Sequence, residues 1–241
     1  MSTSVTLITG GSGGLGQALC HSLCGVGPIG IHVHSNIERG EESLRLLKAA
    51  GTESTLFTAD LRDSKSVKKM FDDLLMKWQR LDLLINSAGV IDDHLYATLN
   101  EAAWDHVLDI NLTGVFYCLR EAGRIMKTQG GGHIVNVASQ SAFTGRIGQA
   151  AYTASKRGLI ALTHSAAREW GAYGIQVNAV LPGLLETSMS ASLTPAQKEK
   201  IVNENLLKRP STLPEVSGFI RHLAQMKHVS GQIFNLDSRI Y

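Results

Sequence analysis

Short apolar segments alternate along the chain with longer segments in which hydrophobic residues recur at helical spacing. The apolar segments predict strands at residues 5–9, 29–34, 54–61, 81–89, 132–139, 175–183 and 231–237. The amphipathic segments between them predict helices at residues 16–27, 38–50, 64–78, 100–127, 149–174, 194–206 and 214–226.

Strands this uniformly apolar are typical of a parallel sheet whose two faces are both covered by helices. Repeated strand–helix units with right-handed crossovers produce a doubly wound sheet. We therefore predict an α/β fold, a Rossmann-type doubly wound parallel sheet of about seven strands, in a single domain over residues 1–241. The polar helical segment at 184–212 is expected to form a substrate-binding lid, in which Met189 and Leu193 either face an acyl chain or pack the lid onto the body.

Composition narrows the class of protein. The 241 residues are 44% hydrophobic and 18% charged, with a net charge of +2, which is too small to indicate nucleic acid or an anionic membrane as partner. No apolar run approaches the roughly 20 residues of a membrane span, and the N-terminal sequence does not resemble a signal peptide. Cys20, Cys24 and Cys118 form no disulfide framework, so we expect a cytoplasmic location. Cys20, His21 and Cys24 fit helix packing better than a metal site, and no metal is predicted.

A glycine-rich turn, TGGSGGLG at 9–16, follows the first predicted strand and leads into a helix. Glycines allow a tight turn and a close approach to phosphate, and the helix N-terminus offers free amides and the positive end of its dipole. The pattern matches G-x-G-x-x-G in the required strand–turn–helix context, so a dinucleotide site is favoured over a purely structural turn. Its predicted residues are Gly10, Ser12, Gly13, Gly14, Leu15 and Gly16.

The end of the second predicted strand bears on which nicotinamide nucleotide binds. An acidic residue there would accept hydrogen bonds from the adenosine ribose and repel a 2′-phosphate. The chain instead has His34, Ser35 and Asn36, with no carboxylate before Glu38 and with Arg39 close by. This pattern favours NADPH over NADH, and the alternative is a loop that accepts either.

Tyr152 and Lys156 stand four residues apart in the predicted helix AYTASKRG, 151–158. They share a helix face, so the ammonium could stabilise a phenolate and make the tyrosine an acid or base. The alternative is a solvated lysine beside a half-buried tyrosine.

Two further predicted strands end in polar or small residues, in NSAG (86–89) and VASQSA (137–142). Because ligands bind at the carboxyl ends of strands in such sheets, Asn86, Ala88, Gly89 and Ser139 are expected beside the glycine turn.

The sequence resembles the short-chain dehydrogenase/reductase family over essentially its whole length. The resemblance rests on TGGSGGLG, NSAG, Asn111 in DINLTG, Ser139, YTASK (152–156) and PG (182–183), which occur in the family's order and spacing. It implies a catalytic tetrad of Asn111, Ser139, Tyr152 and Lys156. Tyr152 would exchange the proton with the substrate, Lys156 would lower its pKa and hold the nicotinamide ribose, Ser139 would bind the substrate oxygen, and Asn111 would hold a relay water.

The resemblance also implies cofactor contacts outside the glycine turn. Asp60 and Leu61 resemble the pair that flanks adenine, and Thr187 is similar in position to a residue that touches the carboxamide. Together with the residues already named, Tyr152, Lys156, Pro182 and Gly183 complete the predicted cofactor site.

Within the family the chain is most similar to 3-oxoacyl-[acyl-carrier-protein] reductases, over 89–116, 167–189 and 229–241. The implied reaction is NADPH-dependent reduction of a 3-oxoacyl thioester, carried by acyl carrier protein or coenzyme A, by a homotetramer. The alternative is an NAD(P)-dependent dehydrogenase of a sugar, polyol or small secondary alcohol; a nucleotide-binding sensor is disfavoured by the complete tetrad. The chain departs from the subgroup at Gly13, where a basic residue is common, and in its closing NLDSRIY, where glycines are usual.

Overall fold

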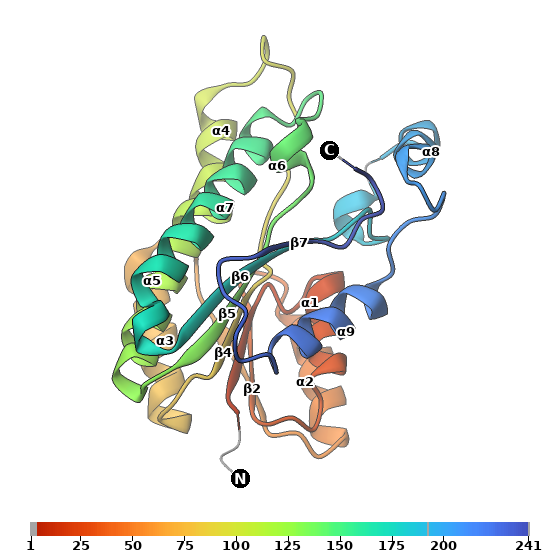
Figure 1. Ribbon diagram of the computed structural model, residues 1–241. Coiled ribbons are helices and arrows are strands. Elements are labelled where there is room, and N and C mark those ends of the chain that lie inside the picture. Colours follow the sequence, from red (N-terminus) through yellow and green to blue (C-terminus); the bar gives the residue numbers. More distant parts are fainter. Residues whose placement is uncertain (1–3, 192, 241) are drawn as a thin grey trace.

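The apolar segments of the chain form the strands of one parallel sheet in the computed structural model, which describes residues 4–191 and 193–240 (Figure 1). The strands are β1 (Thr6–Thr9), β2 (Ile29–Val33), β3 (Ser54–Thr58), β4 (Leu83–Asn86), β5 (Gly132–Val137), β6 (Ile175–Leu181) and β7 (Ile233–Asn235). Their order is β3-β2-β1-β4-β5-β6-β7, and every neighbouring pair is parallel. The predicted doubly wound fold is confirmed.

The strand register brings the carboxyl ends of the central strands to one edge. Thr9 of β1 pairs with Asn86 of β4, which pairs with Asn136 of β5. The chain runs outward from β1 to β3 on one side and returns to β4 on the other, so the strand order reverses between β1 and β4. A crevice at such a switch point is where doubly wound sheets bind ligands, and the glycine turn follows β1 there.

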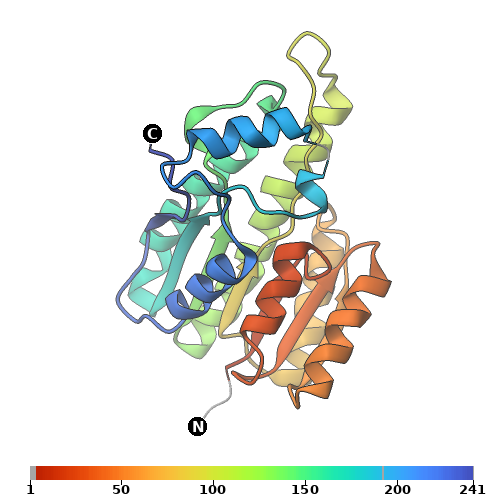
Figure 2. The ribbon, with the colours of Figure 1, turned by 90° about the vertical axis from the view of Figure 1, so that its right-hand side faces the viewer.

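Helices cover both faces of the sheet (Figures 1 and 2). One layer packs on a core that includes Leu19, Ile31 and Ile220, and the opposite layer packs on a core that includes Phe71 and Ile134. The first layer consists of α1 (Gly14–Ser22), α2 (Ile37–Ala49) and α9 (Leu213–Leu223), and the second of α3 (Ser64–Trp78), α4 (Glu101–Leu108), α5 (Gly114–Gln129) and α7 (Ala150–Trp170).

The predicted helix at 100–127 is interrupted. A π-helical turn, η1 (Asp109–Thr113), separates α4 from α5, although the hydrophobic periodicity continues through it. Single π turns inside helices are frequent at functional sites. Asn111 lies within this turn, so the irregular backbone sits at one of the residues predicted to be catalytic.

Most strands end earlier than predicted, because the last residues of the predicted segments leave the ladder and turn across the edge of the sheet. The predicted strand at 81–89, for example, ends at Asn86, and the one at 54–61 ends at Thr58. The first helix ends at Ser22 rather than at 27, because the chain turns there and Gly25 adopts a φ of +77°.

The predicted lid contains two short helices, η3 (Ser188–Ser190) and α8 (Pro195–Glu204). The side chain of Thr194 caps α8 by accepting from the Gln197 amide, and Pro195 opens its first turn. Figures 1 and 2 show α8 standing beyond the carboxyl edge of the sheet, apart from the two covering layers. None of the helices in the described part of the chain is long and apolar enough to cross a membrane.

Candidate active site

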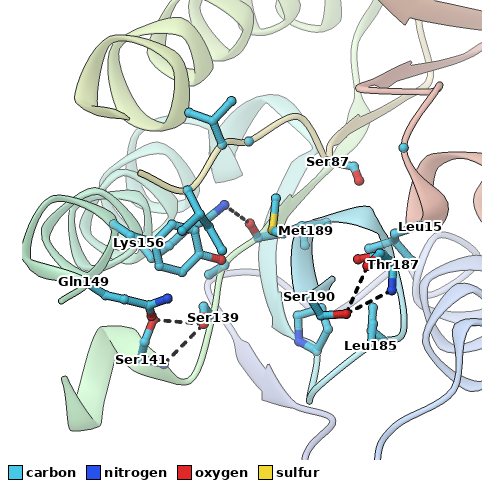
Figure 3. A pocket seen from close by; sticks show the side chains of 18 of the residues that line it. Leu15, Ser87, Ser139, Ser141, Gln149, Lys156, Leu185, Thr187, Met189 and Ser190 are labelled. Carbon is cyan, nitrogen blue, oxygen red and sulfur yellow. Dashed lines mark hydrogen bonds between the residues drawn. The ribbon is translucent and has the colours of Figure 1, made fainter. Parts of the chain in front are cut away.

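A cavity of about 1460 Å³ lies along the carboxyl edge of the sheet. The glycine turn, the segments that follow the strands, the short helix α6 (Ser141–Thr144), the start of α7 and the lid all contribute to its wall (Figure 3). Of the predicted site residues, those that line it are Gly10, Ser12, Gly13, Gly14, Leu15, Gly16, His34, Ser35, Asn36, Asp60, Leu61, Ala88, Gly89, Ser139, Tyr152, Lys156, Pro182, Gly183 and Thr187. Asn86 and Asn111 are buried behind the wall.

Several glycines of the turn are packed too closely against other atoms to carry a side chain. Gly10 has a φ of +69°, and a Cβ there would lie 2.7 Å from the Cα of Ala88; a Cβ on Gly16 would lie 2.3 Å from the Gly10 carbonyl oxygen. The turn leads into α1, whose first amides have no acceptor within the helix. These amides face the cavity at the positive end of the helix dipole, and the arrangement fits the pyrophosphate of a dinucleotide.

His32, on β2, holds the glycine turn in place. Its Nδ1 accepts from the Gly10 amide at 3.2 Å, its Nε2 lies 3.1 Å from the Ala59 carbonyl, and its own carbonyl accepts from the Gly11 amide at 2.9 Å. Burial lowers the pKa of His32 to about 4, so the ring is neutral at pH 7 and Nε2 carries the proton. Sequence analysis did not single it out, because a histidine inside an apolar strand carries no motif.

Arg39 follows β2 closely enough in the sequence to help hold a phosphate, but in the structure its side chain is directed elsewhere. Its guanidinium donates to Gln17 Oε1 on α1 at 3.0 Å, and the residue does not line the cavity. A different arginine, Arg62, lines the cavity beside Asp60 and His34. Side-chain direction just past a strand end depends on tertiary packing, and the sequence offered no signal that separated the two arginines.

Tyr152 and Lys156 stand one turn apart on α7 and both line the cavity. Lys156 is buried, and its Nζ donates to the Val137 carbonyl at 2.8 Å while lying 5.7 Å from the centre of the Tyr152 ring (Figure 3). Burial lowers the pKa of Lys156 to about 8. A lysine with this pKa is still mostly an ammonium at pH 7, and it can exchange its proton at a pH slightly above 7.

The pKa of Tyr152 is raised, whereas we expected Lys156 to lower it. Burial is the largest cause, and the hydrogen bond with Ser139 opposes it; the charges of Asp93 and Arg146 have smaller and opposite effects. The expectation was wrong because the lysine ammonium is directed to the Val137 carbonyl rather than to the phenol oxygen. Tyr152 is therefore a protonated phenol at neutral pH.

Ser139 follows β5 and is oriented by Ser141. Its Oγ accepts from the Ser141 hydroxyl at 3.0 Å and from the Ser141 amide at 3.2 Å (Figure 3). Both contacts use lone pairs of Ser139, so its own hydroxyl proton is the one that it can donate, to Tyr152 or to a group in the cavity. Ser139 and Tyr152 thus present two adjacent O–H donors to one point.

Asn111 is completely buried and pairs with the backbone of Val90. Its Oδ1 accepts from the Val90 amide at 2.8 Å, and its Nδ2 donates to the Val90 carbonyl at 2.9 Å and to Ser155 Oγ at 3.3 Å. Ser155 Oγ in turn donates to the Tyr152 carbonyl at 2.7 Å. The π turn therefore places an amide that fixes the segment after β4 against the helix that carries Tyr152.

Asn86 belongs to a second buried network. Its Nδ2 donates to Asn136 Oδ1 at 2.8 Å, and Asn136 Nδ2 donates to Thr163 Oγ1 at 2.9 Å. The structure directs this side chain between β4, β5 and α7, away from the cavity in which we expected it.

Gln149 is a further cavity residue that the sequence analysis did not identify. It is buried one turn before Tyr152 and lies near Ser139 and Ser141 in Figure 3. Its Nε2 donates to Asp93 Oδ2 at 3.2 Å. A bridge between His94 and Gln149 joins the two loops, which lie far apart in the sequence. Gln149 thus adds a fixed amide near the pair of hydroxyl donors.

Comparison with known proteins agrees with this geometry. Residues 4–198 match the family model described as short chain dehydrogenase. The chain belongs to this family. It is therefore an oxidoreductase whose family binds a nicotinamide cofactor.

Relatives of this short-chain dehydrogenase match over nearly their whole length. The 3-oxoacyl-[acyl-carrier-protein] reductase FabG of Staphylococcus aureus strain Mu50 is 34% identical over 242 residues, covering 99% of this chain and 98% of that protein. A 3-oxoacyl-[acyl-carrier-protein] reductase of a Synechocystis species is 33% identical over 241 residues, with 98% and 96% covered.

Solved structures with the same fold belong to proteins whose names give different activities. A short-chain alcohol dehydrogenase of Sinorhizobium meliloti, described as putative in its name, superposes with a TM-score of 0.93 at 28% identity, covering 99% of this chain and 96% of that one. Levodione reductase superposes with a TM-score of 0.90 at 30% identity, with 99% and 97% covered. An actinorhodin polyketide ketoreductase variant, solved with NADPH, superposes with a TM-score of 0.91 at 27% identity, with 98% and 96% covered.

The segment at 184–212, predicted to be a lid, lines the cavity with both apolar and polar side chains. Met189 and Leu193 both line it, so each is in a position to meet a substrate, as well as to pack the lid. The cavity face of α8 is largely polar, however, and consists of Gln197, Lys200, Ile201 and Glu204.

The C-terminal segment completes this wall. Arg239 lines the cavity and pairs with the buried carboxylate of Asp237, while its Nη1 lies 3.8 Å from Glu204 Oε2 on α8. The closing NLDSRIY, where glycines are usual in the subgroup, therefore places a cation between α8 and the segment that follows β7.

Proposed function

We propose that this chain is an NADPH-dependent reductase of 3-oxoacyl thioesters, which it converts to 3-hydroxyacyl thioesters. The observation that carries the proposal is the convergence of Ser139, Tyr152 and Lys156 in the same cavity as the glycine turn. The relatives named 3-oxoacyl-[acyl-carrier-protein] reductase, at 32–34% identity over nearly the full chain, support the choice of substrate.

Tyr152 would protonate the substrate oxygen during reduction. Its raised pKa keeps the phenol protonated at neutral pH, which suits a general acid in carbonyl reduction better than a base in alcohol oxidation. Ser139 would donate a second hydrogen bond to the same oxygen, so that both O–H groups stabilise the negative charge where it develops. When bound, the nicotinamide would supply the hydride.

Lys156 and Asn111 would support Tyr152 in different ways. One Nζ–H of Lys156 donates to the Val137 carbonyl. The other two Nζ–H groups can donate to the nicotinamide ribose and supply a proton to replace the one that Tyr152 gives up. Asn111 would fix the Val90 segment and, through the carbonyls around it, hold a relay water. The amides of the first turn of α1 would hold the pyrophosphate, and Asp60 and Leu61 would flank the adenine.

The acyl group would enter beneath residues 184–212, which we propose as the substrate lid, with Met189 facing the acyl end. Either acyl carrier protein or coenzyme A would present the thioester. We also propose a homotetramer assembled through α5 and α7; the side chain of Phe116 on α5 is 43% exposed, and Arg120 stacks on it at 5.7 Å. Light scattering of the purified protein should then give four times the 26.0 kDa mass of the chain.

A second candidate is a dehydrogenase of a sugar, polyol or small secondary alcohol. The polar face of α8, with Gln197, Lys200 and Glu204 in the cavity wall, favours a hydroxylated substrate over a long apolar chain. The similarity to an alcohol dehydrogenase and to levodione reductase points the same way.

One assay separates the two candidates. Purified protein is mixed with NADPH or NADH and acetoacetyl-coenzyme A, and cofactor absorbance is followed; a parallel series offers the oxidised cofactors with polyols and 2-butanol. Tyr152→Phe serves as the blank, and Tyr96→Phe, at an exposed tyrosine outside the cavity wall, serves as the matched control. Thioester-dependent loss of NADPH that disappears only in Tyr152→Phe supports the reductase. Oxidation of an alcohol without any thioester reduction supports the second candidate.

A further inference from the structure

Arg239 is held firmly in the cavity wall by the closing segment NLDSRIY, in which glycines are usual in the subgroup. Its Nε donates to Asp237 Oδ2 at 2.8 Å, and its Nη2 donates to the same oxygen. The Arg239 amide donates to Asp237 Oδ1 at 3.1 Å, and the Arg239 carbonyl accepts from Asn235 Nδ2 at 3.1 Å. The Asp237 carboxylate is fully buried, whereas the Arg239 side chain is 20% exposed. The guanidinium is therefore fixed from behind, and part of it remains accessible from the cavity.

The fold places this guanidinium to one side of the predicted catalytic residues. Asp237 packs on the segment after β6, because a Cβ on Gly183 would lie 3.1 Å from its carboxylate. The segment after β7 also passes the end of α8 (Figures 1 and 2). Ser139 follows β5, and β7 lies two strands away from β5 in the sheet. Two strand spacings correspond to about 10 Å, so Arg239 can meet a part of the substrate that lies away from the reacting carbonyl.

One nitrogen of the guanidinium, Nη1, makes no hydrogen bond within residues 4–191 and 193–240. It faces the Glu204 carboxylate of α8, but the 3.8 Å between Nη1 and Oε2 is too long for a hydrogen bond. The Glu204 side chain is 51% exposed, so this ion pair is weak and another anion can replace it. Lys200, one turn earlier on α8, also lines the cavity and forms no ion pair with any residue that the structure describes. This side of the cavity thus offers donors to an anion.

We infer that Arg239 determines substrate specificity: its Nη1 binds an anionic group of the substrate, which replaces Glu204, and Lys200 adds a second positive charge. Two sources would supply such a group, a carboxylate on the acyl chain and a phosphate of the thioester carrier. Asp237 would act as a positioning residue, because it occupies Nε and Nη2 and so directs Nη1 toward α8. The inference rests on the proposed function, since it assigns a charge to the substrate of the same site.

Matched thioesters test this inference. Three substrates share the reacting 3-oxoacyl thioester and differ in charge. Acetoacetyl-N-acetylcysteamine is neutral, 3-oxoadipyl-N-acetylcysteamine carries a carboxylate on the acyl chain, and acetoacetyl-coenzyme A carries phosphates on the carrier. In addition, calorimetry on the protein saturated with NADP⁺ measures the binding of adipate and of coenzyme A, neither of which has a carbonyl that can be reduced here. The calorimetric measurement therefore needs no turnover.

The variants separate the charge of Arg239 from its structural role. They are Arg239→Gln, Arg239→Lys, Glu204→Gln and Arg209→Gln. Arg209 is the matched control, because it also pairs with a carboxylate, that of Glu215 at 3.3 Å, but does not line the cavity. The double variant Asp237→Asn/Arg239→Gln accompanies them, because loss of Arg239 alone leaves the buried Asp237 carboxylate unpaired and can destabilise the fold.

We expect the unaltered protein to prefer at least one of the two anionic thioesters. A hydrogen bond to a charged group corresponds to roughly 10- to 100-fold in affinity, so kcat/KM should exceed that of the neutral thioester by about this factor, mainly through KM. Arg239→Gln and the double variant should lose the preference, and Arg239→Lys should keep part of it. Glu204→Gln should lower the KM of the anionic thioester a few-fold, because the competing carboxylate is gone. Arg209→Gln should leave the ratio unchanged.

The pattern of preference identifies the source of the anionic group. A preference confined to the 3-oxoadipyl thioester assigns it to the acyl chain, and one confined to coenzyme A assigns it to the carrier. Equal kcat/KM for all three thioesters in the unaltered protein would overturn the inference. An equal loss for all three in the double variant, or a changed ratio in Arg209→Gln, would overturn it as well.

A failure of the proposed function gives a different result. If none of the thioesters is reduced, the assignment to 3-oxoacyl thioesters is wrong, and calorimetry alone decides the inference. Binding of adipate or coenzyme A that weakens at least about 10-fold in the double variant would support an anion site at Arg239. Binding that is absent in the unaltered protein, or equal in the two proteins, would disprove it.

Discussion

Replacing Asn111 by alanine should both destabilise the protein and slow its reaction. Asn111 is fully buried and pairs with the amide and the carbonyl of Val90 at 2.8 and 2.9 Å, with a further bond to Ser155 at 3.3 Å. The alanine variant leaves both Val90 groups without this partner, and each unsatisfied buried group costs about 1–3 kcal/mol. Val90 is only half-buried, so the lower part of that range applies, and the total is about 2–4 kcal/mol.

For a domain of this size, 1 kcal/mol lowers Tm by roughly 2–4 °C, so the expected drop is roughly 4–16 °C. Turnover should fall on the order of 100-fold, because a small displacement of the Val90 segment and of Tyr152 disturbs the reacting geometry. Calorimetry and the NADPH assay measure the two effects. The matched control is Asn100→Ala, which removes one exposed cap of α4, bonded to the Ala103 amide at 2.9 Å, at a cost of about 1 kcal/mol and with unchanged turnover.

The Asn111→Ala result also separates two roles for the residue. A large loss of turnover with an unchanged Tm would refute the positioning role and leave only the water relay. A large drop in Tm with normal turnover per folded molecule would refute any role in the reaction.

Three further outcomes follow from other parts of the structure. Gly10→Ala places a Cβ 2.7 Å from the backbone of the segment after β4, at a residue whose φ is +69°. The affinity for the nucleotide, measured by fluorescence, should therefore fall at least about 10-fold. An unchanged affinity would contradict the close packing of the turn. Burial lowers the pKa of His32 and of His133 to about 4, below the ordinary 6.5, so only the unfolded chain takes up their protons between these values. The free energy of unfolding, measured in urea, should therefore decrease as the pH falls from about 6.5 to 4, and the decrease should be smaller in His32→Asn. An equal decrease in both proteins would contradict the neutral, buried state of His32. Glu204→Gln breaks the 3.8 Å ion pair with Arg239. The free energy of unfolding should change by less than ~1 kcal/mol, while the KM for substrate shifts a few-fold. An identical KM would show that the ion pair does not hold the proposed lid.

The strand–helix alternation and the glycine turn could be predicted because they depend on local rules. Buried parallel strands are apolar throughout, and a turn that must approach phosphate needs glycine, so residues 5–16 indicated both strand and site. The four-residue spacing of Tyr152 and Lys156 likewise fixed their common helix face.

Features that depend on tertiary packing could not be predicted. Nothing in the hydrophobic periodicity marked the π turn at Asp109–Thr113, because its side chains continue the helical pattern. The Arg62 side chain pairs with Asp60 at the cavity and the Arg39 side chain pairs with Gln17 on α1, and both directions are set by tertiary packing. The raised pKa of Tyr152 follows from its burial and from the direction of the lysine ammonium, and neither is visible in the spacing of the two residues.

The most direct test of the proposed reaction is the fate of the hydride. NADPH deuterated at C4 of the nicotinamide, on each face in turn, is incubated with acetoacetyl-coenzyme A and the protein, and the product is analysed by mass spectrometry. We predict 3-hydroxybutyryl-coenzyme A with one deuterium at C3 from one of the two faces, and no product with Tyr152→Phe. Unchanged acetoacetyl-coenzyme A at high concentrations of folded, NADPH-binding protein would contradict the assignment of this site to 3-oxoacyl thioesters.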